Sequence, residues 1–514
     1  MSRRPRTLRL ALLAGTAALL AGCGGKTRVQ IADPQVCPLT LLDISTDPIP
    51  SKPATGAATA TAATAKAEPP PPESPFFSEV KRALKSYRYT PKPTAAPSDG
   101  AVPAAAAVPA AAPAPSGPPF ERRALVLSGG GKWGSFGAGF LQALYGNDAG
   151  WAGGPKEFAV VTGVSTGALQ APFMFVAAEK VKNGNTRYTA AADTLLAKTD
   201  VPVGKRTYLD DLPLAYRISR SKSVVDLHVK SAGSLDLWAG ITALRKGSLG
   251  DLKGLRTRLA ALVDDGMLEA IAKGEDADRK LFVGIVDFDS GRPFAVDMTK
   301  LAKAYTDAAD TDKPRLIGCF HDVLVASSSE PLLAQPVFIR RQAPKGQKQD
   351  DEPTRMYMDG GVRHGVFLRE VVDAAQGQTK QETTVIINGT LTPADRSGDS
   401  GWMAKWDLLG LVRRAQALVT DQLYQSSVER VRDFAVGQGV VRIKTARNYE
   451  KHVYASKTGD PVPNQSMMCK DWQKAEQNEG FPPMFMRCLI DFGAKEAGHP
   501  NGKPNWDLVR PEPS

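Results

Sequence analysis

Two apolar segments that each end in a glycine-rich turn and lead into a helix constrain the fold of this chain most strongly. The first, 124–127, runs into three consecutive glycines before a small-residue helix that begins near Ser135. The second, 158–161, ends in Gly-Val-Ser-Thr-Gly at 163–167. Short apolar runs of this length are typical of buried strands. Strands and helices continue to alternate further along the chain, which predicts an α/β fold.

Gly163, Ser165 and Gly167 have the G-x-S-x-G spacing of a nucleophile elbow. A serine on a sharp strand-to-helix turn projects its Oγ out of the sheet, and its neighbours must be nearly free of side chains so that the backbone can turn. We therefore predict that Ser165 is a nucleophile. A purely structural glycine-rich turn is the alternative interpretation.

Gly129, Gly130 and Gly131 supply what a serine nucleophile lacks. Their consecutive backbone N–H groups, unobstructed by side chains and near a helix N-terminus, are predicted to face a developing oxyanion. Alone, such a turn could equally hold a phosphate or a dinucleotide. Because it precedes the serine motif by one strand–helix unit, each motif supports the other.

A third motif, Asp359-Gly360-Gly361, follows the apolar segment 356–358. The strand delivers an aspartate into a Gly-Gly turn and leaves its carboxylate uncovered at the strand end. Taken alone, Asp-Gly favours a hairpin turn. Taken with the upstream motifs, the order is a glycine-rich oxyanion loop, G-x-S-x-G and then D-G-G.

That order resembles the patatin-like phospholipase family, from about Arg123 to Asn388. The resemblance implies a three-layer α/β/α sandwich with a mostly parallel central sheet. It implies a catalytic dyad of Ser165 and Asp359, with oxyanion donors at 129–131. The implied activity is hydrolysis of lipid acyl esters, of the phospholipase A or lysophospholipase type, with no cofactor or metal. The segment 326–331 also resembles the family's segment before the D-G-G strand.

The chain departs from the family pattern at two places. The family reads G-G-G-x-[Lys/Arg]-G, whereas here Lys132 comes one position early and Trp133 occupies the usual place before Gly134. This departure leaves the backbone donors in place. After Gly361 an Asn is common in the family, and this chain has Val-Arg-His-Gly at 362–365, which bears on substrate positioning.

Two other functions fit parts of the sequence. One is an α/β-hydrolase esterase with a Ser-Asp-His triad. The histidines after the serine are His228, His321, His364, His452 and His499. Only His364 lies near a motif, where it follows Asp359 closely instead of standing in a separate loop. The other is a non-catalytic envelope lipoprotein that binds lipid or a protein partner on a hydrolase fold.

The N-terminus combines arginines, an apolar run over 10–20 and the sequence Leu-Ala-Gly-Cys at 20–23. A run this short that ends in small residues is typical of a signal peptide, here 1–22, and not of a membrane span. The last four residues resemble a bacterial lipobox, so we predict that Cys23 is lipidated and anchors the protein to a membrane surface. Gly24 follows it and favours the outer membrane. An ordinary signal peptide with a chance cysteine is the alternative.

The segment 23–120 is dominated by Ala, Pro, Thr and Ser, so we expect a disordered linker. One island, 76–89, predicts a short helix that docks on the body or on the membrane. The catalytic domain is predicted at 121–395. A helical extension of the same domain, 396–514, is predicted to end in a disordered tail.

In this extension, Trp402 and Trp406 lie one turn apart in a long helical run, for which core packing is favoured over a membrane-facing lid. The segment 440–446 alternates as an edge strand does. Cys469 and Cys488 could pair in an oxidising envelope, whereas Cys319 is predicted to be a buried thiol. No cysteine spacing indicates a metal site.

The net charge of +11 falls to +7 when the four arginines of the signal peptide are removed. A balance this mild, without a dense Lys/Arg block, favours anionic membrane surfaces weakly and does not indicate nucleic acid as a partner. The oligomeric state is left open.

Overall fold

The computed structural model describes residues 34–45, 73–87, 122–146, 157–181, 206–227, 248, 250–375, 381–391, 439–477, 479–498 and 504–510, together with 418, 419, 422, 425, 426 and 429. The predicted signal peptide with Cys23, and the two tryptophans Trp402 and Trp406, lie outside these residues. Among the described helices, none combines the length and the apolar character needed to cross a membrane.

One mixed sheet organises the described residues, in the order β1-β9-β10-β7-β4-β3-β11-β12-β15, with β8 beside β7 and β2 beside β8. Its strands are β1 (Val36–Cys37), β2 (Leu41–Asp43), β3 (Arg122–Leu127), β4 (Val160–Val164), β7 (Lys280–Asp287), β8 (Arg292–Asp297), β9 (Val337–Arg341), β10 (Thr354–Asp359), β11 (Gln381–Ile387), β12 (Val440–Thr445) and β15 (Leu508–Arg510). The central strands β7, β4, β3, β11 and β12 are parallel, and antiparallel pairs lie toward both ends. The predicted α/β fold with a mostly parallel central sheet is confirmed.

Side chains of the central strands alternate between two apolar cores, because successive residues of a strand point to opposite faces. On β3, Leu125 and Leu127 pack in one core, and Ala124 and Val126 pack in the other. The strand is buried along its whole length. Burial on both faces explains why the sequence shows a continuous apolar run here.

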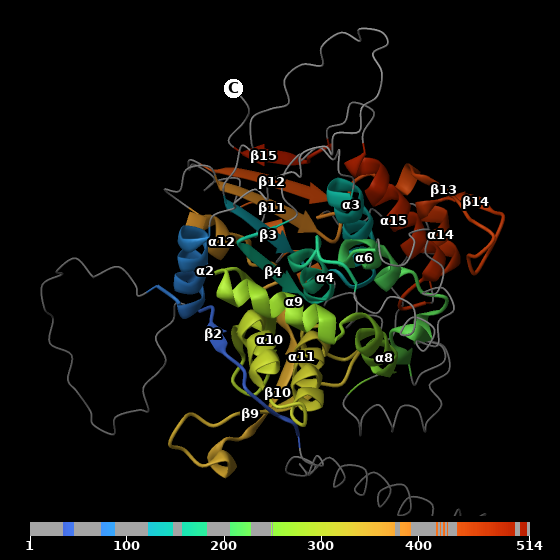
Figure 1. Ribbon diagram of the computed structural model, residues 1–514. Helices are drawn as coiled ribbons and strands as arrows, with labels where there is room; N and C mark the ends of the chain where they lie inside the picture. Colours follow the sequence, from blue (N-terminus) through green and yellow to red (C-terminus); the bar gives the residue numbers. More distant parts are fainter. Residues whose placement is uncertain are drawn as a thin grey trace, which may run out of the picture. The chain divides into compact units, whose positions relative to one another are not determined.

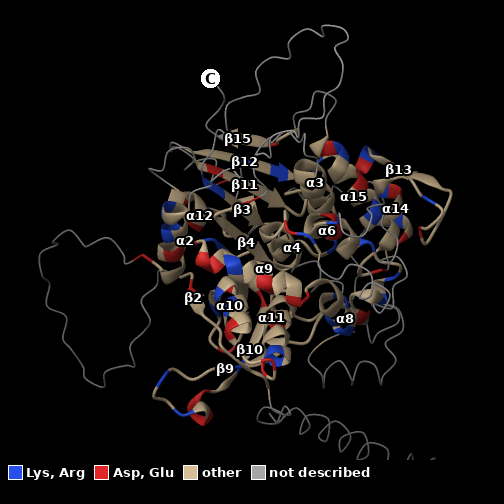
Figure 2. Ribbon diagram, in the orientation of Figure 1, with Lys and Arg blue, Asp and Glu red and all other residues tan. Residues whose placement is uncertain are grey.

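Helices cover both faces of the sheet, so the described fold is a three-layer α/β/α sandwich (Figure 1). The helices are α2 (Pro75–Ser86), α3 (Gly134–Gly146), α4 (Thr166–Phe175), α6 (Tyr208–Tyr216), α8 (Lys253–Leu262), α9 (Asp265–Asp276), α10 (Met298–Asp307), α11 (Lys313–Ser327), α12 (Leu368–Ala375), α14 (Cys469–Ala475) and α15 (Pro483–Ala497). α2 and α12 lie side by side on one face, and α3, α4, α9, α10, α11 and α15 pack into the core of the other. Lys/Arg and Asp/Glu are intermixed on α2, α10 and α14 (Figure 2).

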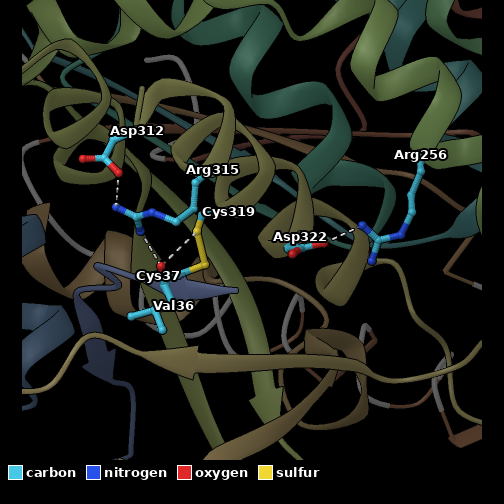
Figure 3. The surroundings of a disulfide bond; sticks show 7 residues. All are labelled: Val36, Cys37, Arg256, Asp312, Arg315, Cys319 and Asp322. Atoms are coloured by element: carbon cyan, nitrogen blue, oxygen red, sulfur yellow. Dashed lines mark hydrogen bonds and ion pairs between the residues drawn. A yellow bond between two sulfur atoms is a disulfide. The ribbon is translucent and has the colours of Figure 1, made fainter. Parts of the chain in front are cut away.

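The N-terminal segment 36–45 belongs to the fold, so the expectation of a structureless linker over all of 23–120 is wrong there. β1 pairs with β9, and β2 pairs with β8. Cys37 forms a disulfide with Cys319 on α11, so Cys319 is not the free buried thiol that we predicted. Beside this bond, Arg315 donates a hydrogen bond to the carbonyl oxygen of Val36 (Figure 3). Strands of two or three residues carry no periodic signal, and the surrounding Ala/Pro-rich composition conceals them.

The island predicted at 76–89 forms α2 and docks on the body, one of its two expected positions. The Phe76 ring contacts the rings of Phe282 and Phe367 at centroid distances of 5.1 and 5.0 Å. Ser74 caps the helix by accepting a hydrogen bond from the Phe77 N–H at 3.2 Å. This part of the predicted linker therefore helps to bury one face of the sheet.

The C-terminal extension contributes strands as well as helices. β12 lies between β11 and β15, so it is not the edge strand that its alternation indicated. β15 falls in the tail that we predicted to be disordered. Its three residues pair with the edge of β12, and the local sequence does not reveal this pairing. Two short ladders complete the strands, β5 (Asp226–Leu227) with β6 (Gly250–Asp251) and β13 (Val453–Ala455) with β14 (Ser466–Met468). Cys469 and Cys488 form a disulfide, which confirms the pairing considered from the sequence.

Candidate active site

The turn between β4 and α4 holds Ser165 in a strained backbone conformation. Ser165 has a φ of 54° and a ψ of −123°, and residues other than glycine rarely hold a positive φ. A β-carbon on Gly163 would lie 2.3 Å from the carbonyl oxygen of Gly167, and one on Gly167 would lie 2.4 Å from that of Leu127. Only glycine fits at these two positions, which agrees with the steric reason for the G-x-S-x-G spacing.

β4 and β10 meet end to end along one edge of β7. Val164, the last residue of β4, pairs with Gly284, and Asp359, the last residue of β10, pairs with Ile285. Because β4 is parallel to β7 and β10 is antiparallel to it, their C-terminal ends face each other. Ser165 follows Val164, and Ser165 and Asp359 line the same pocket. The topology therefore brings the predicted nucleophile and the predicted base together.

Asp359 has an unusual electrostatic environment for a carboxyl group. It is only 6% exposed, and its carboxylate accepts a hydrogen bond from the Gly361 N–H at 2.7 Å. Burial raises the pKa of Asp359 to about 7, and the negative charge of Glu330 acts in the same direction, while the hydrogen bonds from Ser165 and Gly361 lower it. A carboxylate whose pKa lies near neutrality is a better proton acceptor than an ordinary one.

The C-terminal end of α11 and the residues that follow it hold both Ser165 and Asp359 in place. The Oγ of Ser327 accepts a hydrogen bond from the Ser165 N–H at 2.9 Å and donates one to the carbonyl oxygen of Gly284 at 2.6 Å. The carbonyl oxygen of Ser329 accepts one from the Asp359 N–H at 3.1 Å. The sequence indicated this segment only through its resemblance to the family's segment before the D-G-G strand.

The glycine loop after β3 offers two candidates for the predicted oxyanion donors, and not three. The Gly129 N–H donates a hydrogen bond to the carbonyl oxygen of Gly365 at 3.0 Å, so it is engaged elsewhere and the prediction is wrong for this residue. Gly130 and Gly131 have φ values of 147° and 55°. Gly130 caps the short helix η1 (Gly131–Trp133) and Gly131 begins it, so their N–H groups have no intrahelical acceptor.

An apolar pocket lies beside Ser165 and Asp359. Gly131, Thr166 and Glu330 line it together with these two residues. Much of the remaining wall consists of apolar side chains, among them Leu169, Phe173, Leu255, Leu259, Phe481 and Met486. A mostly apolar pocket with a few convergent polar groups is typical of a ligand site. Phe481 and Met486 come from the C-terminal extension, which therefore takes part in the site.

Part of the chain matches a known protein family. Residues 125–372 match the model of the patatin-like phospholipase family. They form a patatin-like phospholipase domain. The family supports hydrolysis of lipid acyl esters as the general activity. A search of curated proteins found no match. Among solved structures, the crystal structure of VipD from Legionella pneumophila aligns at 15% identity over 73% of this chain and 67% of that chain, with a TM-score of 0.23.

The basic residue of the patatin-like loop is directed toward the C-terminal extension. The Lys132 Nζ lies 5.9 Å from the ring centroid of Phe485, and Trp133 packs edge-on against Tyr449 and Phe485. A β-carbon on Gly134 would lie 2.0 Å from the Oγ1 of Thr166, so this glycine is sterically required. The displaced order of Lys132 and Trp133 thus suits contacts with α15.

The D-G-G motif of the patatin-like domain is also sterically constrained. Asp359 ends β10 and enters the short helix η5 (Gly360–Val362), so the motif is not the hairpin turn that Asp-Gly alone would favour. A β-carbon on Gly360 would lie 2.7 Å from the carbonyl oxygen of Gly284. The glycine is needed because η5 packs against β7.

Among the described residues, no histidine lines the patatin-like pocket. His364 follows the D-G-G motif and donates its backbone N–H to the carbonyl oxygen of Gly360 at 2.8 Å. Burial and the neighbouring charge of Arg363 lower the pKa of His364 to about 4, so its ring is neutral at pH 7. His321 contacts a backbone carbonyl and His452 contacts Asp491. The remaining candidates, His228 and His499, lie outside the described residues.

Two buried polar residues next to the patatin-like site were not predicted. Gln170 lies in an otherwise apolar helix, and Asn388 directly follows the apolar strand β11. A lone polar residue in such a position is a usable signal, because a buried amide must find hydrogen-bond partners. Both amides find theirs around the glycine loop.

Proposed function

We propose that the protein hydrolyses lipid acyl esters, in the manner of a phospholipase A or lysophospholipase, with Ser165 as nucleophile and Asp359 as base. The observation that supports this most is that Ser165 and Asp359, at strand ends that face each other along β7, line the same apolar pocket. The strained φ of Ser165 adds support, since such strain is concentrated at functional sites.

In the acylation step, the Asp359 carboxylate accepts the Oγ proton of Ser165 as Oγ attacks the ester carbonyl carbon. The C–O bond forms, the carbonyl π electrons move to oxygen, and the N–H groups of Gly130 and Gly131 stabilise the oxyanion. When the intermediate collapses, the bond to the leaving alcohol breaks and Asp359 passes its proton to that oxygen. An acyl ester of Ser165 remains.

Deacylation repeats these steps with water as the nucleophile. Asp359 accepts a proton from water, hydroxide adds to the acyl carbon, and the proton returns to the Oγ of Ser165 as the fatty acid leaves. A pKa of about 7 suits Asp359 to both roles, because it can accept and release a proton near neutral pH.

The substrate class follows from the lining of the pocket. The apolar side chains of α4, α8 and the segment before α15 suit a fatty acyl chain, with its ester carbonyl between Ser165 and Gly131. Burial of apolar surface contributes roughly 0.8 kcal/mol per CH₂ group. A long-chain ester should therefore bind more tightly than a short one.

The test uses phosphatidylcholine vesicles whose two acyl chains differ in length. Released fatty acid and lysophospholipid are quantified by mass spectrometry for the parent, Ser165→Ala and Asp359→Asn. We expect both variants to lose at least about 10³-fold in rate, because groups that act as a unit fail together. Ser290→Ala and Asp350→Asn, at exposed positions, are the matched controls. Full activity in a folded Ser165→Ala protein would refute the proposal.

We also propose that the protein is a lipid-anchored component of the bacterial cell envelope, held at the outer membrane through Cys23. The support is the lipobox-like sequence at 20–23 and the glycine that follows it. Cys23→Ser should abolish acylation, shift the electrophoretic mobility and release the protein from the membrane fraction. Unchanged fractionation of Cys23→Ser would contradict this anchor.

A further inference from the structure

Three buried polar residues form a continuous cluster between the elbow helix and the glycine loop. Gln170 belongs to α4, Asn388 follows β11, and Ser128 follows β3. Their exposed fractions are 0%, 2% and 0%. Groups buried this deeply are expected to be fully hydrogen-bonded, and a buried network that is satisfied rigidifies its surroundings.

Asn388 holds the beginning of the glycine loop. Its Nδ2 donates to the carbonyl oxygen of Ser128 at 2.7 Å, and its backbone N–H donates to the Oγ of Ser128 at 2.8 Å. Its own carbonyl oxygen lies where a side chain on Gly130 would stand, 1.9 Å from the β-carbon position. Asn388 therefore contacts the loop through both its side chain and its backbone.

Gln170 holds the end of the same loop. Its Nε2 donates to the carbonyl oxygen of Gly134 at 2.7 Å, and its Oε1 accepts from the Nδ2 of Asn388 at 3.1 Å. The two amides thus join carbonyl oxygens at positions 128 and 134, on either side of Gly130 and Gly131. A neutral amide suits this place because it donates and accepts at once, whereas a carboxylate would face carbonyl oxygens.

The same helix carries Gln170 and the serine. Ser165 is the N-cap residue of α4, and Gln170 lies within that helix. A contact between Gln170 and the loop therefore sets the distance between the serine and the loop N–H groups. Catalysis is sensitive to this distance, since a misplacement of about 1 Å can cost on the order of 100-fold in rate.

We propose that Gln170 and Asn388 are positioning residues, which hold the N–H groups of Gly130 and Gly131 at the oxyanion that forms on attack by Ser165. The inference rests on the proposed hydrolase function. It extends the site to Asn388, which lies beyond the segment 125–372 that matches the family. Neither amide lines the pocket, so both act through the loop and not on the substrate.

The test measures kcat and KM for a short-chain chromogenic ester with Gln170→Glu and Asn388→Asp. Each change keeps the shape of the side chain and removes the donor that holds a carbonyl oxygen. We expect kcat to fall by about 10- to 100-fold, with KM changing by less than about threefold, because the lost alignment concerns the oxyanion. Gln342→Glu, at an exposed position, is the matched control.

A second readout separates positioning from a general loss of structure. A trifluoromethyl ketone forms an oxyanion on Ser165, so its inhibition constant should rise in parallel with the fall in kcat/KM. A product fatty acid has no such oxyanion, and its inhibition constant should stay within about threefold of the parent value. The double variant Gln170→Met/Asn388→Ser should be little worse than Gln170→Met or Asn388→Ser alone, since the two residues act as one unit.

The outcomes distinguish this inference from the function on which it rests. If folded Gln170→Glu and Asn388→Asp proteins keep kcat within about threefold of the parent while Ser165→Ala is inactive, the positioning role is wrong and the hydrolase function stands. If Ser165→Ala is active, the hydrolase function itself fails. Should the charged variants not fold, Gln170→Met removes the same hydrogen bonds without a charge, and the same threshold applies to it.

Discussion

A β-carbon on Gly493 of α15 would lie 2.3 Å from the carbonyl oxygen of Phe136 on α3. In the opposite direction, a β-carbon on Gly139 of α3 would lie 2.0 Å from the carbonyl oxygen of Ile490. The two helices are therefore in backbone contact. Because α15 also brings Met486 to the pocket wall, this contact fixes part of the site.

We expect Gly493→Ala to destabilise the protein by at least about 1–3 kcal/mol, the usual cost of overpacking a core. The cost arises because the new methyl group meets rigid backbone and not a movable side chain. Thermal unfolding followed by circular dichroism measures the effect. Gly459→Ala, where no atom lies within 4 Å of the added carbon, should leave the unfolding temperature unchanged. Equal temperatures for Gly493→Ala and the parent would contradict the close approach.

The disulfide between Cys37 and Cys319 should stabilise the fold more than the one between Cys469 and Cys488. The first closes a loop of 282 residues and the second a loop of 19. The loss of conformational entropy in the unfolded chain grows with loop length, and removal of a native disulfide typically costs about 2–5 kcal/mol. Thermal unfolding of Cys37→Ser and Cys469→Ser tests the order, and a larger drop for Cys469→Ser would reverse it.

The local motifs of the site could be predicted because each depends on a few adjacent residues. The strained turn at Ser165 requires glycines two residues away on each side, and the sequence has glycine at both positions. The meeting of β4 and β10 on β7 depends on pairing between distant segments. Nothing local to Asp359 shows that its strand enters antiparallel to β7.

The errors have the same origin. The Gly129 N–H is engaged by Gly365, a partner that lies beyond the D-G-G motif, so inspection of the glycine loop alone could not remove it from the donor set. β1 and β15 are two- and three-residue strands that form because an exposed edge stands beside them. The contact between Cys37 and Cys319 depends on that edge, so the local sequence does not reveal the pair.

The activity should depend on pH through Asp359. Its pKa is raised from 3.8 to about 7, and only the ionised form accepts the Ser165 proton. We expect kcat/KM to rise about tenfold per pH unit below pH 7 and to level off above it. A profile that is flat between pH 5 and 8 would show that Asp359 is not the base.

The same shift predicts how stability changes with pH. Since the folded pKa lies above the unfolded value, the folded state holds a proton between about pH 4 and 7 that the unfolded state releases. This contribution is present at low pH and is lost as the pH rises through about 7. The unfolding temperature of the parent should therefore fall relative to that of Asp359→Asn between pH 5 and 8.

A side chain at Gly130 should abolish activity through the backbone of the glycine loop. The added carbon would lie 1.9 Å from the carbonyl oxygen of Asn388, so the loop must shift and its N–H groups no longer point at the oxyanion. Loss of one oxyanion donor typically costs about 10²–10³ in kcat. We therefore expect Gly130→Ala to lower kcat by at least about 100-fold.

The matched control for this change is Gly291→Ala. Gly291 also has a positive φ, of 68°, but no atom lies within 4 Å of its β-carbon position. It should show backbone strain without a loss of kcat. Full activity in a folded Gly130→Ala protein would remove the loop from the mechanism.

The dyad and the triad predict different responses to the loss of histidine. A triad enzyme depends on its histidine as strongly as on its serine, because the residues act as a unit. A Ser165–Asp359 dyad does not, and the described histidines lie outside the pocket wall. Alanine substitution at each candidate should therefore leave substantial ester hydrolysis, whereas Ser165→Ala and Asp359→Asn should each abolish it. The substitutions are made at His228, His321, His364, His452 and His499.

His364 is the most informative of these positions, because it lies near Asp359 and its ring is neutral at pH 7. A partial loss of activity there fits a contact with the substrate or an effect on the base. Each purified variant is assayed with a short-chain chromogenic ester, and circular dichroism confirms its folding. A folded histidine variant that falls to the Ser165→Ala level, together with an active Asp359→Asn protein, would replace the dyad with a triad, because the proton would then have to pass through imidazole.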